Sequence, residues 1–436
     1  MWTRRTFLRL SGGIGATALA GGGETLRTIS AASAAVSGEP PDRVARDESY
    51  WRHVQRAFDV DRTLINLNNG NSSPCPRVVH DAFKHHLDVS NRLPAYYRGL
   101  IEQNIPQVRQ QLATEFGCDA DELAIMRNAT EALHVAQCGL DLTPGDEVVT
   151  TDQDYSLMLW AWNQRAVRDG LSIRRIQFPV PATGADLLER FTRALTPRTK
   201  VLHFCHMSNT TGQLFPVRDL CRLAAERGIF TIVDGAQATA HVPVNLHDLG
   251  CDVYGASLHK WLMAPHGTGF LYVRRDRIAE IWPLHAERDI PNANIWKFEE
   301  IGTHPAAAVA AIPDAVAFHR AIGAERKAAR LRYLTLRWAD ALKSEPRIKM
   351  LSSLEPGETW GMATMEIAGV NAQRLAQYLL DARRIVVAAE VDQKFPGPIF
   401  EYQGIRVTPN VYSTLGEIDT FVRAIKAVLE HGLPPA

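Results

Sequence analysis

The sequence of 436 residues lacks several features that would place it in other functional classes. Basic and acidic residues are equal in number, 48 of each, and no polybasic run or basic stripe is present. A nucleic-acid-binding surface needs such a basic patch, so nucleic acid is not an expected partner. No Gly-rich dinucleotide loop and no Walker loop follows an early strand, which disfavours a nucleotide-binding transferase. No internal repeat or low-complexity block occurs, and 46% hydrophobic residues is typical of a globular protein.

Cysteine is scarce, and its distribution argues against two kinds of site. The six cysteines are Cys75, Cys118, Cys138, Cys205, Cys221 and Cys251. No two of them form a Cys-x-x-Cys pair, so neither a zinc site nor a thioredoxin-type site is indicated. We expect most of them to be small buried side chains, although one or two could form disulfides in an oxidising compartment.

The first 34 residues differ in character from the rest of the chain. Thr3-Arg4-Arg5-Thr6-Phe7-Leu8-Arg9 has the form of a twin-arginine export motif, a Gly/Ala-rich stretch follows over residues 12–22, and Ala32-Ser33-Ala34 offers a cleavage site. This order predicts a signal peptide over residues 1–34, export by the twin-arginine translocase and a periplasmic location. The apolar stretch is too short and too rich in glycine for a stable membrane span.

After a polar linker, apolar strands alternate with amphipathic helices. Strands are expected at residues 64–67, 123–126, 147–151, 173–177, 201–205, 229–233, 253–256 and 269–273. Strands separated by helix-length segments imply right-handed crossovers and a mostly parallel sheet. We expect a linker and helix over residues 35–65, a large α/β domain over 66–305 and a smaller α+β domain over 306–436. The smaller domain is expected to hold strands at 363–367, 386–387 and 404–407 and a final helix at 415–430.

Polar residues follow one predicted strand after another. They are Asn128-Ala129-Thr130, residues 152–155 ending in Tyr155, Ser208-Asn209, Asp234, and residues 257–260 ending in Lys260. In an open α/β sheet, ligands bind beyond the carboxyl ends of the strands. The sequence therefore predicts one site, at this edge of the sheet.

Asp234 and Lys260 suggest the chemistry of that site. The acid ends one strand, and the lysine follows the next, flanked by Ser257, His259 and a Gly-rich turn. An enzyme that uses pyridoxal 5'-phosphate (PLP) needs a lysine to form a Schiff base and an acid to pair with the pyridinium nitrogen. The alternative is that Lys260 is a solvated loop lysine and Asp234 caps a helix.

Residues 234–273 resemble the class V aminotransferase family within the fold type I PLP enzymes. His259-Lys260-Trp261-Leu262 with Gly267-Thr268-Gly269-Phe270-Leu271 is most similar to the isopenicillin N epimerase-like branch. The resemblance runs from about Asn66 to the C-terminal helix. It implies PLP as the cofactor, and a fold with a mostly parallel, seven-stranded-type sheet between helices plus a smaller α+β C-terminal domain.

The resemblance also implies roles for the residues around the cofactor. Lys260 would hold PLP and move protons at the substrate Cα, while Asp234 would keep the pyridine nitrogen protonated. Tyr155 would stack on the ring, Asn209 would lie beside it, and Gln237 would bond its phenolic oxygen. The phosphate would lie at a helix N-terminus, where free N–H groups favour an anion, within a cup formed by Ala129, Thr130, Ser257 and His259.

Other residues are implied in subunit assembly and substrate binding. Gly302-Thr303 resembles the loop that reaches the phosphate of a partner subunit, so a homodimer with a shared site is expected. Arg406 would grip the substrate α-carboxylate in a bidentate manner; the alternative is an internal ion pair. Asn69 would close over the substrate. Unranked candidates for substrate contact are Tyr96, Tyr97, Arg98, His203, His206 and His266.

The reaction itself stays open at this stage. Relatives that are cysteine desulfurases use a cysteine on a loop after the lysine, and residues 260–436 contain none. The remaining choices are epimerisation or transamination through proton transfer at Cα, β-elimination, and oxidative decarboxylation with oxygen. A PLP-fold binding protein is the non-enzyme alternative, although it would not need the carboxylate grip of Arg406. Together with the export motif, the resemblance favours tailoring of an amino-acid residue in a peptide metabolite, such as a periplasmic siderophore.

Overall fold

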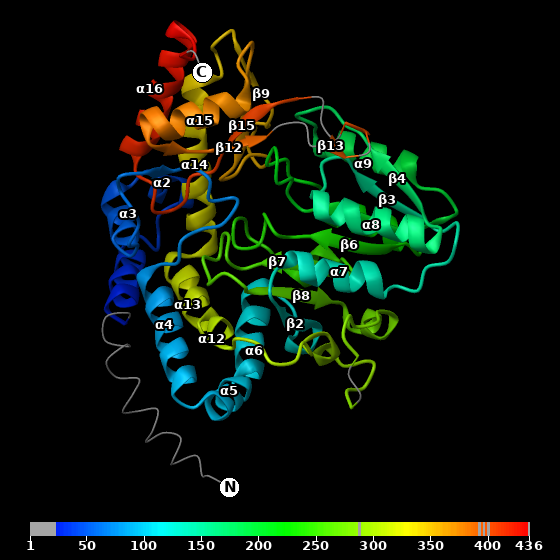
Figure 1. Cartoon of the computed structure of the whole chain (residues 1–436). Helices are drawn as coiled ribbons and strands as arrows, with labels where there is room; N and C mark the ends of the chain where they lie inside the picture. Colours follow the sequence, from blue (N-terminus) through cyan, green and yellow to red (C-terminus); the bar gives the residue numbers. More distant parts are fainter. Residues whose placement is uncertain (1–22, 287–288, 391–393, 396, 399–401, 435–436) are drawn as a thin grey trace.

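The computed structural model describes residues 23–286, 289–390, 394–395, 397–398 and 402–434. The twin-arginine motif and the Gly/Ala-rich stretch lie outside the described residues. Figure 1 shows a large α/β part built on one sheet and, beside it, a smaller part that contains the C-terminal helix. Of the helices in the described ranges, none has both the length and the apolar character needed to cross a bilayer.

The large part is built on a seven-stranded sheet with the order β2-β8-β7-β6-β5-β3-β4. Neighbours from β7 to β4 are parallel, whereas β8 is antiparallel to both β7 and β2. The expectation of a mostly parallel, seven-stranded sheet is therefore confirmed. The strands are β2 (Leu123–Met126), β3 (Glu147–Thr151), β4 (Ser172–Ile176), β5 (Thr199–Cys205), β6 (Phe230–Asp234), β7 (Val253–Ser257) and β8 (Gly269–Val273).

Helices cover both faces of this sheet. They include α6 (Ile105–Phe116), α7 (Ala129–Gly139), α8 (Ser156–Asp169), α9 (Gly184–Ala194), α10 (Val217–Ala225) and α11 (Leu246–Leu249), with the short 3₁₀ turns η1 (Ala120–Glu122), η2 (Arg275–Glu280) and η3 (Ile295–Phe298). Successive strand residues point to opposite faces. Val148 thus packs in the core under α7 and α8, and Val149 packs in the core under α6, α9 and α10. Burial on both faces explains the almost continuous apolar strands of the sequence.

The C-terminal part is an antiparallel sheet covered by helices, and this too is as expected. Its strands have the order β12-β15-β10-β9. Helices α12 (Ala307–Ala310), α13 (Ile312–Ile322) and α14 (Ala324–Leu342) lead into it. The remaining elements are β9 (Ile348–Met350), β10 (Ala363–Ile367), α15 (Ala372–Arg383), β11 (Ile385–Val386), β12 (Ala388–Glu390), β13 (Lys394–Phe395), β14 (Gly397–Pro398), β15 (Gly404–Val407) and α16 (Leu415–His431).

The N-terminal segment joins the two parts. Its elements are α2 (Pro41–Val44), α3 (Glu48–Gln55), β1 (Ile65–Asn66), α4 (Arg77–Arg92) and α5 (Pro94–Glu102). In Figure 1 the first helices (blue) run alongside α13 and α14 (yellow). Strand β1 pairs in parallel with β11, and Asn68 bridges to Thr408. Residues 65–68 therefore pair with the C-terminal part before the chain enters the large domain.

The expected cleavage site lies within a packed helix. Residues 23–35 are helical, and the Ile29 side chain in this helix is fully buried. The Ser33 hydroxyl donates to the Ala321 carbonyl at 2.6 Å and is hydrogen-bonded to the Tyr50 hydroxyl at 2.9 Å. Removal of residues 1–34 would therefore delete contacts that the folded chain makes.

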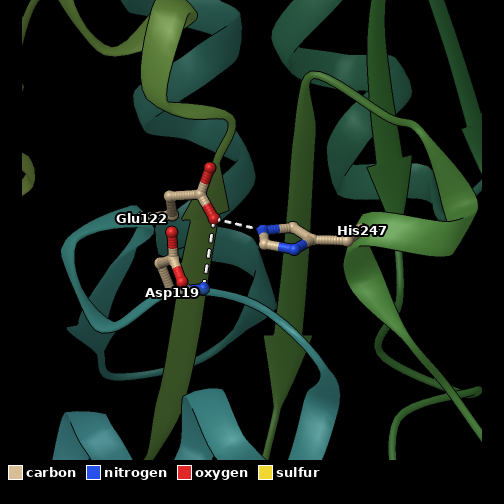
Figure 2. A group of neighbouring side chains, drawn as sticks. All are labelled: Asp119, Glu122 and His247. Atoms are coloured by element: carbon tan, nitrogen blue, oxygen red, sulfur yellow. Dashed lines mark hydrogen bonds and ion pairs between the residues drawn. The ribbon is translucent and has the colours of Figure 1, made fainter.

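Asp119, Glu122 and His247 form a cluster that joins the start of β2 to α11 (Figure 2). One oxygen of Glu122 accepts from the His247 ring at 2.5 Å and from the Asp119 N–H at 3.2 Å, and the other accepts from the Arg275 N–H at 3.1 Å. The Asp119 carboxylate is paired with the Arg275 guanidinium at 2.9 Å. The spacing would suit a metal ion, but these atoms already bind one another and Arg275, so the cluster is explained as a structural clamp.

Candidate active site

A cavity of about 220 Å³ lies at the carboxyl ends of the central strands, where the sequence predicts the site. Apart from Asn69 and Thr303, every predicted site residue lines it. The lining residues are Gly70, Asn71, Asn128, Ala129, Thr130, Tyr155, Met158, Cys205, Met207, Asn209, Asp234, Ala236, Gln237, Ser257, His259, Lys260 and Arg406. The topology thus brings together residues spread over more than half of the sequence.

Lys260 and Asp234 carry opposite charges in this cavity. Asp234 is the last residue of β6, is 5% exposed, and accepts from the Ala236 N–H at 2.9 Å. Burial raises the pKa of Asp234, while the Ala236 N–H and the Lys260 ammonium act against that rise. Burial lowers the pKa of Lys260 to about 8; Asp234 opposes this shift and Arg406 adds to it. The lysine therefore has a substantial neutral fraction near neutral pH, as a nucleophilic amine needs.

The N-terminus of α7 forms the anion-binding end of the cavity. The Asn128 side chain caps the helix by accepting from the Glu131 N–H at 2.9 Å, and the Ser257 hydroxyl accepts from the Ala129 N–H at 2.9 Å. The first N–H groups of a helix have no partner within the helix, and the helix dipole attracts an anion to them. Thr130 adds a hydroxyl at the same end.

His259 supports the fit of a phosphate group here. Its Nδ1 atom is buried and has no hydrogen-bond partner among the described residues. Burial, reinforced by Lys260 and His266 and opposed by a hydrogen bond to the Thr268 backbone, lowers the pKa of His259 to about 4, so the ring is neutral at neutral pH and carries a single N–H. A buried polar atom without a partner is costly unless a ligand satisfies it. The residues at this end thus fit the PLP phosphate that the resemblance implies.

Gly269 allows this end of the cavity to form. A Cβ at this position would lie 2.5 Å from the Ala256 carbonyl oxygen and 2.7 Å from the Asn128 Cα. Strand β8 therefore passes so close to the start of α7 that only glycine fits without a shift of the backbone. This is a physical reason for the Gly-Thr-Gly turn seen in the sequence.

Tyr155 and Gln237 lie in the middle of the cavity. Tyr155 precedes α8 and is 39% exposed, so its ring is available at the cavity surface for stacking. The Gln237 amide donates to the Gly70 carbonyl at 2.8 Å and accepts from the Trp261 indole N–H at 3.0 Å. Gln237 thus joins the N-terminal segment to the residue that follows Lys260, in addition to facing the cavity.

Arg406 reaches the cavity from β15 and is 6% exposed. Its Nη2 donates to the Asn68 side-chain oxygen at 3.0 Å, its Nη1 donates to the Asn209 carbonyl, and Nη1 lies 3.0 Å from a carboxylate oxygen of Glu390. Its Nε atom is buried and has no hydrogen-bond partner among the described residues. The internal ion pair considered from the sequence is thus present, and it still leaves one N–H without a partner.

The structure places Asn69 differently from the expectation. The Asn69 amide donates to the Asn66 and Thr408 carbonyls at 3.1 and 2.9 Å, and its oxygen accepts from the Tyr412 hydroxyl at 2.7 Å. It is fully buried and holds the end of β15 instead of facing the cavity. Its neighbour Asn68, which bridges to Thr408, is the residue whose side chain contacts Arg406.

Thr303 also lies away from the cavity of its own subunit. Its hydroxyl accepts from the Arg98 guanidinium at 2.9 Å. Its neighbours Gly302 and His304 line a separate groove of about 750 Å³, together with Trp296 and other apolar side chains. This placement leaves open the expected contact with a partner subunit. Of the unranked candidates, Arg98 and His266 line the groove, and Tyr96, Tyr97, His203 and His206 line neither space.

Several lining residues were not predicted from the sequence: Asn71, Met158, Cys205, Met207 and Ala236. Ala236 directly adjoins predicted residues and could have been included on that basis. Cys205 ends β5 and pairs in register with Asp234, which only the strand alignment reveals. Burial, with help from nearby carboxylates, holds the pKa of this thiol well above its usual value, which disfavours the thiolate that a nucleophile needs.

Comparison with known proteins agrees with this geometry. The chain is 31% identical over 400 residues to an isopenicillin N epimerase from Streptomyces clavuligerus, an alignment that covers 87% of this chain and 98% of that protein. It is 28% identical to a probable cysteine desulfurase from Mycobacterium leprae, with 86% and 94% covered. A solved cysteine desulfurase from Escherichia coli has the same fold, with a TM-score of 0.76 at 21% identity and 87% and 98% of the two chains covered.

A protein-family model matches most of the sequence. The model for aminotransferase class-V matches residues 65–421, a span that contains every residue of the cavity lining. Since the match takes in both the large sheet and the C-terminal sheet, it extends well beyond the short motif around Lys260. The chain therefore belongs to the aminotransferase class-V family, and its cofactor is pyridoxal 5'-phosphate.

Proposed function

We propose that this protein acts at the α-carbon of an amino acid, or of an amino-acid residue in a peptide metabolite, by epimerase- or aminotransferase-like proton transfer. The observation that carries the proposal is the placement of Lys260, Asp234 and Arg406 around one cavity. A lysine, an acid and a carboxylate-binding arginine are the groups that chemistry at an amino-acid α-carbon requires. A protein that merely bound the cofactor would not need the arginine.

Each of these side chains has a distinct task in the proposed reaction. Bound PLP withdraws electrons from the substrate α-carbon, and Asp234 maintains that pull by holding a positive charge at the pyridine nitrogen. Arg406 holds the α-carboxylate, which fixes how the substrate is oriented. Lys260 holds the cofactor and then, as a neutral amine, takes or returns the proton at the α-carbon. Tyr155 covers the ring.

The choice of proton transfer rests on two further observations. The relative that is 31% identical is an isopenicillin N epimerase. The other relatives include cysteine desulfurases, but all six cysteines of this chain precede Lys260. A desulfurase that forms a persulfide on a loop after the lysine is therefore disfavoured.

A homodimer with a shared site is part of the proposal. The groove beside Thr303 is lined by apolar side chains that include Leu87, Trp296 and Phe298. Leu87 and Trp296 are 42% and 45% exposed, and large exposed apolar patches mark interaction surfaces. A second copy seated there would place its Gly302-Thr303 loop toward the phosphate end of this subunit's cavity. If light scattering shows that the holoenzyme is a monomer, and this monomer binds PLP with full affinity, this part of the proposal is refuted.

Export by the twin-arginine translocase to the periplasm is also proposed, on the motif at residues 3–9; the small residues at 32–34 lend it no support, because they lie within a packed helix. That route carries folded proteins, which suits an enzyme that must acquire its cofactor in the cytoplasm. Arg4→Lys with Arg5→Lys should abolish export while leaving the cytoplasmic protein active, and unchanged fractionation would contradict it.

The proposed reaction is tested with purified protein. PLP should give an absorption band at ~410–430 nm, and Lys260→Ala should remove this band without changing the far-UV circular dichroism. In D₂O, a substrate should gain deuterium at Cα; free amino acids and periplasmic peptide metabolites are to be compared. No band after addition of PLP would refute the assignment. Fast turnover of common free amino acids but no peptide would refute the peptide-tailoring part.

A further inference from the structure

Glu390 is a buried acid that the proposed reaction does not use. It ends β12, which pairs with β15 in antiparallel register, Ala388 opposite Arg406 and Glu390 opposite Gly404. Residues two apart on a strand share a face, so Glu390 lies diagonally across from Arg406. Its carboxylate oxygen is 3.0 Å from Arg406 Nη1, and both side chains are nearly buried, at 9% and 7% exposure.

The ion pair occupies only one edge of the guanidinium. Nη1 carries both the Glu390 contact and the hydrogen bond to the Asn209 carbonyl. On the opposite edge, Nε has no partner in the described part of the chain and Nη2 is bonded to the Asn68 oxygen alone. Since Nη2 has two hydrogens, the Nε–Nη2 edge can still take a carboxylate in the side-on manner. A substrate carboxylate would therefore use donors that Glu390 does not occupy, and it would reach the buried Nε only after a local shift.

The pair also changes the charge that a substrate meets. The cationic side chains that line the cavity are Lys260 and Arg406; Lys260 is opposed by Asp234, and Arg406 is opposed by Glu390. Burial raises the pKa of Glu390, and the guanidinium of Arg406 opposes the rise because the ion pair favours the charged form. One substrate carboxylate already places a second anion on Arg406. A further carboxylate in a substrate side chain would find no cation left for it in this lining.

We propose that Glu390 determines specificity, so that the site accepts α-amino acids with a neutral or cationic side chain and rejects those with an acidic one. This inference rests on the proposed function, because it requires an amino acid with its α-carboxylate on Arg406. Glu390 is not itself among the lining residues, but its charge offsets that of Arg406, and like charges in a partly buried site repel each other strongly. The discrimination against an acidic side chain is expected to be roughly tenfold or more.

The test uses pairs of amino acids that match in shape and differ in charge: glutamine with glutamate, and asparagine with aspartate. Dissociation constants are measured on the dimeric or monomeric holoenzyme, whichever is purified, from the change that each ligand causes in the absorption of bound PLP. The unaltered protein should bind the amide of each pair roughly tenfold more tightly than the acid. Glu390→Gln should bring each ratio close to one. The control Glu430→Gln, which removes a carboxylate that is 74% exposed on α16, should leave the ratios unchanged.

Each result bears on a definite claim. If the unaltered protein binds glutamate and aspartate more tightly than their amides, the inference is wrong and no variant is needed. The inference is also wrong if the Glu390→Gln protein takes up PLP and keeps the amide-to-acid affinity ratios of the unaltered protein. If Glu390→Gln does not fold, Glu390→Met serves as an uncharged replacement of similar length. A protein that takes up PLP but responds to none of the four ligands also refutes the inference. Failure to take up PLP instead refutes the proposed function.

Discussion

The lowered pKa of Lys260 leads to a quantitative prediction about how the apoprotein captures its cofactor. Only the neutral amine attacks the aldehyde of PLP. With a pKa of about 8 instead of the ordinary 10.5, roughly a quarter of the Lys260 side chains are neutral near pH 7.5, compared with roughly a thousandth of ordinary lysines. Lys260 should therefore react roughly 200-fold faster than an exposed lysine on this ground alone.

The assay follows the recovery of the PLP absorption band after PLP is added to apoprotein, from about pH 6 to pH 9.5. The reaction of PLP with Nα-acetyl-lysine is measured in parallel, and its rate is converted to the rate of the neutral amine from the pKa of Nα-acetyl-lysine. Dividing the rate of the protein by this value removes the effect of the ionisation of PLP. The corrected rate should rise about tenfold per pH unit below pH 7 and level off above a midpoint near pH 8. A rate that continues to climb tenfold per unit through pH 9 would refute the reasoning.

The Asp234→Asn variant tests the direction in which the Asp234 carboxylate shifts the pKa of Lys260. The Asp234 carboxylate raises the pKa of Lys260, because an anion favours the protonated amine. Its replacement by a neutral amide of the same shape should shift the midpoint to lower pH and make capture faster near pH 7. At the same time the finished enzyme should lose activity, since the pyridine nitrogen loses its partner. A midpoint that moves upward would contradict the assigned arrangement of charges.

Three more predictions concern particular contacts. A protein that begins at residue 35 should have a lower Tm than one that begins at residue 23, by the equivalent of about 2 kcal/mol or more, because it loses buried Ile29; equal Tm values would mean that this helix adds no stability. Gly269→Ala should weaken PLP binding and lower folding stability by about 1–3 kcal/mol by forcing β8 away from α7. The control Gly416→Ala, within helix α16, should do neither, because its Cβ would meet only Thr414 Oγ1 at 4.0 Å. Burial lowers the pKa of Lys327 to about 7, so the folded protein binds fewer protons than the unfolded chain above that pH, and stability should rise with pH up to the ordinary lysine range. Lys327→Met should remove about 1.4 kcal/mol per pH unit of that rise in urea-denaturation experiments; an unchanged slope would show that Lys327 titrates normally.

The strands and the cofactor end of the site could be predicted because their signals are local. Apolar runs bounded by polar residues gave β2, β3, β8, β10 and β15 with the observed bounds. The residues that follow a strand at its carboxyl end are already close together once the sheet is parallel. For that reason Asn209, Asp234 and Lys260 could be assigned to one cavity from order along the chain.

The substrate end could not be predicted in the same way. Glu390 reaches Arg406 only through the antiparallel register of β12 with β15, and neither residue's neighbours in sequence signal that pairing. The sequence does not reveal which of the adjacent side chains of Asn68 and Asn69 contacts Arg406. The role expected for Thr303 depends on the proposed second subunit, and no pattern within one chain fixes the position of a partner.

The anchoring of Arg406 bears on which bond at the α-carbon is broken. The guanidinium is attached at once to Asn68 from the N-terminal segment, to the Asn209 carbonyl from the large domain and to Glu390 from the neighbouring strand. Three attachments from three parts of the chain leave it little freedom to follow a moving carboxylate. The bond that breaks is the one held perpendicular to the cofactor ring, and a carboxylate held by a fixed arginine cannot easily rotate into that position. We therefore expect deuterium exchange at Cα to be far faster than release of CO₂, and the reverse order would mean that Arg406 does not hold the α-carboxylate.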